Sequence, residues 1–375
     1  MRGLGTLTAL CVPRPRHPAL CWLRPHHPAL SAAAAVLLSV SPAAASGWTI
    51  VPSPPSDGGF FNAVSARTDT DAWAVGDLSA TTPLTARWNG TSWSQVPGPT
   101  VTGATNTVLN AVSAASASDA WAVGRATQSL VTSSLAAHWT GTAWTVVPTP
   151  HIGGSVLTSV ADISPTDAYA IGDPAEALHW DGTTWSLFAV PAPGGATPAL
   201  LSAVAAHSAS DVWIAGQYFD TARNATEPFI AHFNGKTWSP GHVPANGAEF
   251  FGLTVISRSD AWAAGNNLNG KAFTENWTGH SWRVVPNPAS GLLLSVTATG
   301  PGNVTVAGHN TTVNGPTKGI ILSWNGSAWT SVKVPKTGAT EELYSTSAAL
   351  GGSLTWAFGR STSSGGVSNL TLRNG

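Results

Sequence analysis

Aspartate and histidine are the residues of this chain whose spacing could do acid–base or metal chemistry. An aspartate opens the motif Asp-Ala-Trp-Ala-Val-Gly, which returns along the chain with small changes. A fixed carboxylate could act as a general acid or base, and a histidine could bind zinc. The recurring aspartates are Asp71, Asp119, Asp167, Asp211 and Asp260. Three histidines each precede an aromatic residue further along the repeat, namely His138, His179 and His232.

The regular spacing of these residues favours a structural role. A functional site breaks the symmetry of a repeat, whereas these residues follow it. Two copies of the motif carry Asn303 or Leu354 in place of the aspartate. A short Asp side chain in a tight turn can accept hydrogen bonds from nearby backbone N–H groups, so we interpret the aspartates as turn residues. Equivalent histidines of successive repeats diverge, so we expect no metal site and no cofactor.

The elements that position these residues come from a repeat of seven units. Each motif ends in a glycine, and successive glycines are 43 to 51 residues apart. A large apolar or aromatic residue stands ten positions before each aspartate slot, with no insertion expected in any copy. The glycines are Gly76, Gly124, Gly172, Gly216, Gly265, Gly308 and Gly359. The residues ten positions before the slot are Phe61, Leu109, Leu157, Leu201, Phe250, Leu293 and Tyr344.

A second signature follows each motif and completes a unit of four strands. It has the form Trp-Asn-Gly-x-x-Trp, as at 88–93 and 324–329, and often leads into Val-Pro. Two short apolar runs around an Asn-Gly turn predict a β-hairpin. Four strands per unit at this period predict a β-propeller blade. Trp121 and Val123 share one strand face while Ala120 and Ala122 share the other, a pattern that predicts large-against-small packing between blades.

The two ends of the repeat region complete one blade together. Residues 46–52 (SGWTIVP) correspond to a fourth strand alone, and residues 372–375 (LRNG) end a third strand. We therefore expect the N-terminal strand to close the last blade, which removes open sheet edges. The sequence predicts an all-β, seven-bladed β-propeller of four-stranded blades over 46–375 as one domain, since no blade buries its faces alone.

The first 45 residues are typical of a secretory signal peptide. Four arginines without an acid precede the apolar run at 29–40 and an Ala-rich cleavage site at 43–45. Both cysteines, Cys11 and Cys21, fall in this leader, so the mature chain has no disulfide. We expect a secreted, extracellular monomer with no membrane span after the signal is removed. The remaining 13 basic and 18 acidic residues form no basic cluster, which excludes a nucleic-acid partner.

Function is expected where the copies differ, in the loops after each motif glycine. The second-to-third loops and the blade-to-blade connections share one face of the ring and vary in length, and variable loops on a rigid frame commonly carry binding sites. We expect a glycan or a protein surface as the partner of this face. The candidate ligand-binding residues are Arg125, His151, Asp173, Glu176, Tyr218, Asp220, Arg223, His309, Glu341 and Arg360.

The repeat resembles known propeller families. Its Ala-Trp-Ala-Val-Gly strand, its Trp-Asn-Gly hairpin and its Val-Pro ending are similar to kelch-type propellers of the galactose oxidase central-domain kind and to tectonin-type lectin propellers. The chain lacks the kelch double glycine, and its repeats are longer than tectonin repeats. Galactose oxidases use copper with a tyrosine crosslinked to cysteine, and a chain without cysteine after residue 45 cannot form that centre.

Two functions from different classes remain. The first is a secreted, non-enzymatic propeller that binds its ligand through the variable loops. The alternative is an extracellular glycan-cleaving enzyme, sialidase-like or another glycosidase, with carboxylates such as Glu341 and Asp173 at the ring mouth. Sialidases use an arginine triad and a Tyr/Glu nucleophile pair, and the arginines and tyrosines of this chain permit but do not predict such a site.

Overall fold

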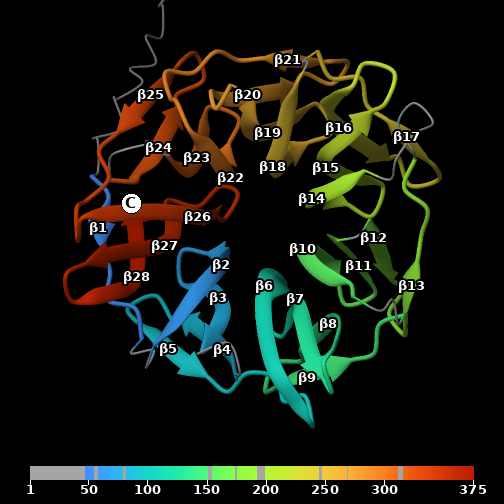
Figure 1. The fold of residues 1–375 in the computed structure, drawn as a ribbon, viewed down its shortest axis with the longest axis vertical. Helices are drawn as coiled ribbons and strands as arrows, with labels where there is room; N and C mark the ends of the chain where they lie inside the picture. Colours follow the sequence, from blue (N-terminus) through green and yellow to red (C-terminus); the bar gives the residue numbers. More distant parts are fainter. Residues whose placement is uncertain are drawn as a thin grey trace, which may run out of the picture. The chain divides into compact units, whose positions relative to one another are not determined.

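The computed structural model describes residues 47–54, 58–78, 82–150, 154–173, 175–191, 199–244, 247–267, 269–310 and 316–375. Within these ranges the 28 strands form seven antiparallel sheets of four, arranged as a ring (Figure 1). The predicted all-β, seven-bladed propeller is therefore confirmed. No helix that could cross a membrane occurs in the described part of the chain. The predicted signal peptide lies outside the described residues.

The blades follow the chain in order, and strands are numbered as in Figure 1. Blade 1 has β2 (Gly59–Thr68), β3 (Asp71–Leu78), β4 (Thr82–Trp88) and β5 (Trp93–Val96), and blade 2 has β6 (Ala104–Ser116), β7 (Asp119–Gln128), β8 (Val131–Trp139) and β9 (Trp144–Val147). Blade 3 has β10 (Val156–Ser164), β11 (Asp167–Asp173), β12 (Glu176–Trp180) and β13 (Trp185–Leu187), and blade 4 has β14 (Leu200–Ser208), β15 (Asp211–Asp220), β16 (Ala225–Phe233) and β17 (Trp238–Pro240). Blade 5 has β18 (Ala248–Ser257), β19 (Asp260–Asn267), β20 (Ala272–Trp277) and β21 (Trp282–Val284), and blade 6 has β22 (Leu292–Gly300), β23 (Asn303–Asn310), β24 (Lys318–Trp324) and β25 (Trp329–Val332). Blade 7 has β26 (Thr340–Ala348), β27 (Thr355–Ser363), β28 (Gly366–Asn374) and, from the other end of the chain, β1 (Thr49–Ile50).

The first strand of each blade is innermost and borders the centre of the ring (Figure 1). The motif glycine marks a β-bulge in the pairing of this strand with the second, as between Leu109 and Ala111 in blade 2. A Cβ on Gly124 would lie 2.0 Å from the carbonyl oxygen of Val108. Only glycine fits at such an approach, which explains why every copy of the motif ends in this residue.

Adjacent blades pack large residues against small ones, as predicted. Trp121 and Val123 of blade 2 belong to one buried cluster with Ala168 and Ala170 of blade 3. Trp121 also contacts Trp185 edge to face, with ring centroids 4.8 Å apart. Edge-to-face aromatic pairs add about 0.5–1.5 kcal/mol beyond the burial of their area. The tryptophans are therefore the scaffold between blades.

The N-terminal strand closes the ring, as predicted. Thr49 pairs with Arg373 and Ile50 with Leu372 in an antiparallel ladder. Trp48 is buried in the cluster that includes Leu370 and Leu372. In Figure 1 the blue strand β1 lies along the outer edge of the red blade. This pairing gives hydrogen-bond partners to backbone groups at the edge of β28, and blade 7 then has four strands like the others.

The predicted register of the last blade was wrong by one residue. Leu343, not Tyr344, pairs with the motif glycine Gly359 and is fully buried. The turn at 349–354 puts six residues between the paired residues Ala348 and Thr355, whereas five residues separate the equivalent pair in every other blade. Asp69 of blade 1 caps this turn, because its carboxylate accepts N–H groups of Ser353 and Leu354 at 3.0 Å. The one extra turn residue shifts Tyr344 to the bulge position between Leu343 and Ser345.

In the described part of the chain the recurring aspartates accept hydrogen bonds from side chains and not from turn N–H groups, so the turn interpretation was wrong. In blades 2, 3 and 4 the partner is the histidine that precedes the third-strand aromatic position. Nε2 of His138 lies 2.6 Å from Oδ1 of Asp119, and the His138 ring stacks on Trp121 at 4.4 Å. In blade 5, Nδ2 of Asn276 donates to Asp260 at 2.8 Å. Each histidine thus contacts the aspartate of its own blade.

Candidate functional site

The two faces of the ring differ in their connections. The turn face carries the first-to-second and third-to-fourth turns, and the loop face carries the second-to-third loops and the blade-to-blade connections. Of the ten predicted binding residues, His151 lies outside the described residues. The others belong to the loop-face half of five blades, so they do not form one site. Blade 2 has Arg125, blade 3 has Asp173 and Glu176, blade 4 has Tyr218, Asp220 and Arg223, blade 6 has His309, and blade 7 has Glu341 and Arg360.

Blade 4 brings three of the predicted residues together on one long hairpin. The ladder of β15 and β16 continues from Gly216 out to the pair Asp220 and Ala225. The turn is fixed by Asp220, whose Oδ1 accepts the N–H groups of Ala222 at 2.8 Å and Arg223 at 3.2 Å. Such an Asx turn is a common use of aspartate at a hairpin end. The hairpin therefore holds its tip residues in a defined place.

A hollow of about 370 Å³ lies beside this hairpin. Tyr218, Arg223 and Glu227 line one side, and the segment 240–244, which leaves the outer strand of the blade, lines the other. Nη1 of Arg223 lies 3.3 Å from Oε1 of Glu227, and the N–H of Gly247 donates to Oε2 at 3.3 Å. Glu227 was missed from the sequence, although its place opposite Tyr218 follows once the hairpin register is known.

The groups in the blade 4 hollow suit recognition. Burial, together with the carboxylates of Asp220 and Glu227, raises the pKa of Tyr218, while Arg223 opposes this shift. Tyr218 is therefore a neutral phenol at neutral pH and can both donate and accept a hydrogen bond. Glu227 is 6% exposed, and Arg223 partly neutralises it from the solvent side. Among the described residues no group of three or more His, Cys, Asp or Glu side chains could hold a metal ion.

A second hollow of about 340 Å³ lies on the other side of the same segment. It shares His242 and the prolines Pro240 and Pro244 with the first hollow and reaches Trp277 and His280 of blade 5. Hollows therefore lie on both sides of the link between blades 4 and 5.

Blade 7 holds a different cluster of predicted and missed residues. The hydroxyl of Tyr344 donates to Oε2 of Glu342. The guanidinium of Arg360 lies 4.4 Å from the ring centroid of Phe60 and 5.5 Å from that of Tyr344. The His309 ring lies 6.1 Å from the Tyr344 ring. Burial and the hydrogen bond to Glu342 raise the pKa of Tyr344. The sequence did not reveal the Tyr344 and Glu342 pair, because it depends on the bulge in β26.

Two of the predicted acids, Glu341 and Glu176, are buried and accept hydrogen bonds from neighbouring groups of the protein. Glu341 is 5% exposed, and its Oε1 accepts the N–H groups of Thr337 and Gly338 at 3.3 and 3.4 Å. Glu176 is 1% exposed and accepts the hydroxyl of Ser134, and burial raises its pKa. Asp173 is exposed in blade 3, across the ring from Glu341 in blade 7 (Figure 1). The structure therefore does not bring Asp173 and Glu341 together as a catalytic pair.

Comparison with known proteins identifies the fold. No protein-family model and no curated protein matches the chain. Among solved structures, YCF48 bound to a D1 peptide is similar with a TM-score of 0.58 and 14% identity, over 87% of this chain and 96% of that one. A GH74 xyloglucanase from Xanthomonas campestris has a TM-score of 0.57 and 14% identity, over 84% of this chain and 53% of that one. A chain of a mitotic checkpoint complex has a TM-score of 0.56 and 10% identity, over 88% and 90%.

These similarities do not separate one function from another. They include a peptide-bound protein and a glycosidase at the same identity, so they establish the β-propeller fold alone. The resemblance to kelch, galactose oxidase and tectonin propellers stays a prediction from the motifs.

Proposed function

We propose that residues 46–375 form an exported, non-enzymatic binding propeller whose blade 4 hollow binds a peptide segment of another protein. The observation that carries this proposal is the hollow that the long hairpin of blade 4 borders together with the segment 240–244. The ladder of the second and third strands extends four pairs beyond the motif glycine in blades 2, 4 and 7, whereas in blade 3 it ends at the pair Gly172 and Glu176. The additional length builds the wall of the hollow.

The chemistry of the hollow suits an extended peptide. Tyr218 and the prolines Pro228, Pro240 and Pro244 supply rigid apolar surface, which loses little conformational entropy on binding. Arg223 and Glu227 supply one charge of each sign, which can fix the direction of a chain. A protein of the same fold, YCF48, is bound to a peptide, which supports peptide as the ligand class. A glycan is the other ligand class that the loop face could bind.

Binding to peptide and glycan arrays tests this proposal. We expect saturable binding to a peptide, and Tyr218→Ala or Arg223→Ala should weaken it at least tenfold while leaving the Tm nearly unchanged. Leu130→Ala is a matched control, because Leu130 is 97% exposed at the tip of the corresponding loop in blade 2. Binding to glycans alone would change the ligand class. Unaltered binding in both blade 4 variants would contradict the site.

Export is tested separately. The leader predicts cleavage after Ala45, so the mature protein recovered from the medium of a secreting host should begin at Ser46. N-terminal sequencing of that protein gives the answer, and an intact leader on protein retained in the cells would contradict export.

The blade 7 cluster supports a second candidate function, a sialidase-like glycosidase. Tyr344 and Glu342 are hydrogen-bonded as a nucleophile pair would be, and Arg360 adjoins them. Turnover of a sialoside panel that is lost in both Tyr344→Phe and Glu342→Gln would support this function. Absence of turnover in the unaltered protein would leave the cluster a structural contact between blades 7 and 1.

A further inference from the structure

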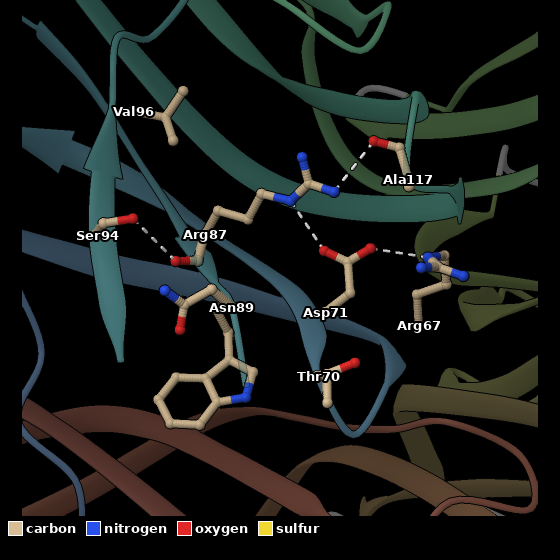
Figure 2. Close-up of a pocket in the computed structure, with 9 residues that line it drawn as sticks. Arg67, Thr70, Asp71, Arg87, Asn89, Ser94, Val96 and Ala117 are labelled. Carbon is tan, nitrogen blue, oxygen red and sulfur yellow. Dashed lines mark hydrogen bonds and ion pairs between the residues drawn. The ribbon is translucent and has the colours of Figure 1, made fainter. Parts of the chain in front are cut away.

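A hollow of about 400 Å³ lies on the turn face beside blades 1 and 2, on the face opposite the blade 4 hollow. Arg67, Asp71 and Arg87 are its charged residues (Figure 2). Arg67 also borders a hollow of about 470 Å³ at the centre of the ring, so this arginine lies between the two spaces. None of the residues predicted for ligand binding belongs to it.

Two arginines share one carboxylate in this hollow. Nε of Arg67 donates to Oδ2 of Asp71 at 2.8 Å, and Nε of Arg87 donates to Oδ1 at 2.9 Å (Figure 2). In blades 2 to 5 the equivalent aspartate pairs with a histidine or an asparagine instead. Two permanent positive charges against one negative charge leave this site with a net charge of one positive unit.

The guanidinium groups of Arg67 and Arg87 are held in place, but most of their terminal nitrogens donate no hydrogen bond to the described part of the protein. Nη2 of Arg87 donates to the carbonyl of Ala117 at 3.1 Å, and the Arg87 guanidinium lies 5.3 Å from the ring centroid of Trp73. Nη2 of Arg87 is the one of the four terminal nitrogens of Arg67 and Arg87 that has a protein partner among the described residues. The two side chains are 32% and 28% exposed, so the remaining N–H groups are accessible. A fixed guanidinium with free donors is preorganised for a ligand.

The other polar groups of the hollow add donors. Oδ1 of Asn89 already accepts the N–H groups of Thr91 and Ser92, which leaves its Nδ2 as a donor toward solvent. Asp71 is the one carboxylate of the hollow, and each of its oxygens already binds an arginine. The unused hydrogen-bonding capacity of the hollow is therefore mostly that of donors, beside a net positive charge.

We propose that this hollow binds the oxyanion of a ligand, namely a carboxylate, sulfate or phosphate group. The planar fork of a guanidinium matches such a group with two parallel hydrogen bonds. The site is separate from the blade 4 hollow, so it binds a different part of the same ligand or a different ligand.

Titration with simple anions tests the proposal. Sodium acetate, sulfate and phosphate are each added to the purified protein at constant ionic strength, and the NMR signals of the Nε–H groups of Arg67 and Arg87 are followed. We expect saturable shifts with at least one anion, and the preferred anion distinguishes a carboxylate from a sulfate or phosphate. Arg67→Gln should weaken binding at least tenfold, and it leaves the pair of Arg87 and Asp71 intact.

Two further variants separate recognition from structure. Asp71→Asn removes the competing negative charge, so in protein that remains folded it should tighten anion binding severalfold, an effect that a purely structural arginine cannot produce. Arg258→Gln removes one charge from the turn face at blade 5 and should leave the affinity unchanged. An absence of saturable shifts, or an equal loss in Arg258→Gln and Arg67→Gln, would overturn the proposal.

Discussion

Asp162 of blade 3 lies in the electrostatic field of Asp119 of blade 2, and burial together with this carboxylate raises the pKa of Asp162 to about 8. Oδ2 of Asp162 accepts the N–H of Ala115 at 3.1 Å, whereas Oδ1 is buried without a partner in the described part of the chain. The other blades have alanine or valine at this position of the innermost strand. These residues are Ala66, Ala114, Ala206, Val255, Ala298 and Ala348.

Asp162→Asn should therefore stabilise the protein increasingly as pH rises. The pKa of Asp162 in the folded state lies above its unfolded value of 3.8. Between about pH 4 and pH 8 the folded protein therefore keeps a proton on Asp162 that the unfolded protein has lost. As pH rises through this window, the unaltered protein loses unfolding free energy with a slope of at most about 1.4 kcal/mol per pH unit. The Asn variant does not have this loss. Urea denaturation at pH 5, 7 and 9 measures the difference.

The matched control is Asp181→Asn. Asp181 is exposed in a hairpin turn, and hydrogen bonds from Thr183 and Thr184 lower its pKa to about 2. Its titration falls below the tested range, so the free-energy difference between this variant and the unaltered protein should be flat from pH 5 to 9. A flat difference for Asp162→Asn as well would show that Asp162 titrates normally.

Asp211 and Asp260 occupy the same position of the repeat, have different partners, and have pKa shifts of opposite direction. Burial would raise the pKa of Asp211, but hydrogen bonds from His232 and Trp213 outweigh burial and lower it. Burial raises the pKa of Asp260, whose partner Asn276 is neutral. Asp211 thus contributes stability above its unfolded pKa of 3.8, and this stability is lost as pH falls through the lower folded value.

His232→Asn should move Asp211 toward the behaviour of Asp260. We expect the pKa of Asp211 to rise and stability at pH 7 to fall by about 1–3 kcal/mol, because a buried carboxylate loses a charge-assisted hydrogen bond. The loss should shrink as pH falls below 4 and through the lower folded pKa, where Asp211 becomes protonated in the folded state as well. Carboxyl NMR titration and denaturation at pH 3 and 7 measure these effects. An unchanged Asp211 pKa would contradict this account.

The sequence predicts the scaffold well because the scaffold is repeated. Seven copies of one spacing predict the strands, the role of Trp121 and the closure by residues 46–52. The prediction failed where a copy departs from the repeat, since Leu343 replaces Tyr344 when blade 7 lengthens its first turn. A single inserted residue changes which side chain faces the core, and no local pattern shows this change.

The polar contacts were harder to predict than the fold. His138 and Asp119 are 19 residues apart and meet only through the pairing of β7 and β8. A signal was present, because blades with an aspartate in the slot carry His, Arg or Asn before the third-strand aromatic position. Arg67 and Arg87 could not be assigned to one hollow without side-chain directions. Unlike the repeat, such a juxtaposition occurs once and leaves no period to detect.

The closing strand provides a further test of the fold. Trp48 is 7% exposed and packs beside Leu372, whereas Ile50 on the same segment is 50% exposed. Trp48→Ala should cost about 3–5 kcal/mol of unfolding free energy, as for other large-to-small core changes. Ile50→Ala should stay within about 0.5 kcal/mol, as for other surface changes. Chemical denaturation measures both, and equal effects would show that β1 is not anchored through Trp48.

The pairing of β1 with β28 also sets the order of assembly. Thr49 and Arg373 are 324 residues apart, whereas the sheets of blades 1 to 6 join strands that follow one another in sequence. Local hairpins can therefore build six blades, and the seventh requires the far end of the chain. Until then the outer edge of β28 is open, and β1 of a second copy fits it equally well. We therefore expect a higher protein concentration during folding to favour strand-exchanged dimers over the closed ring.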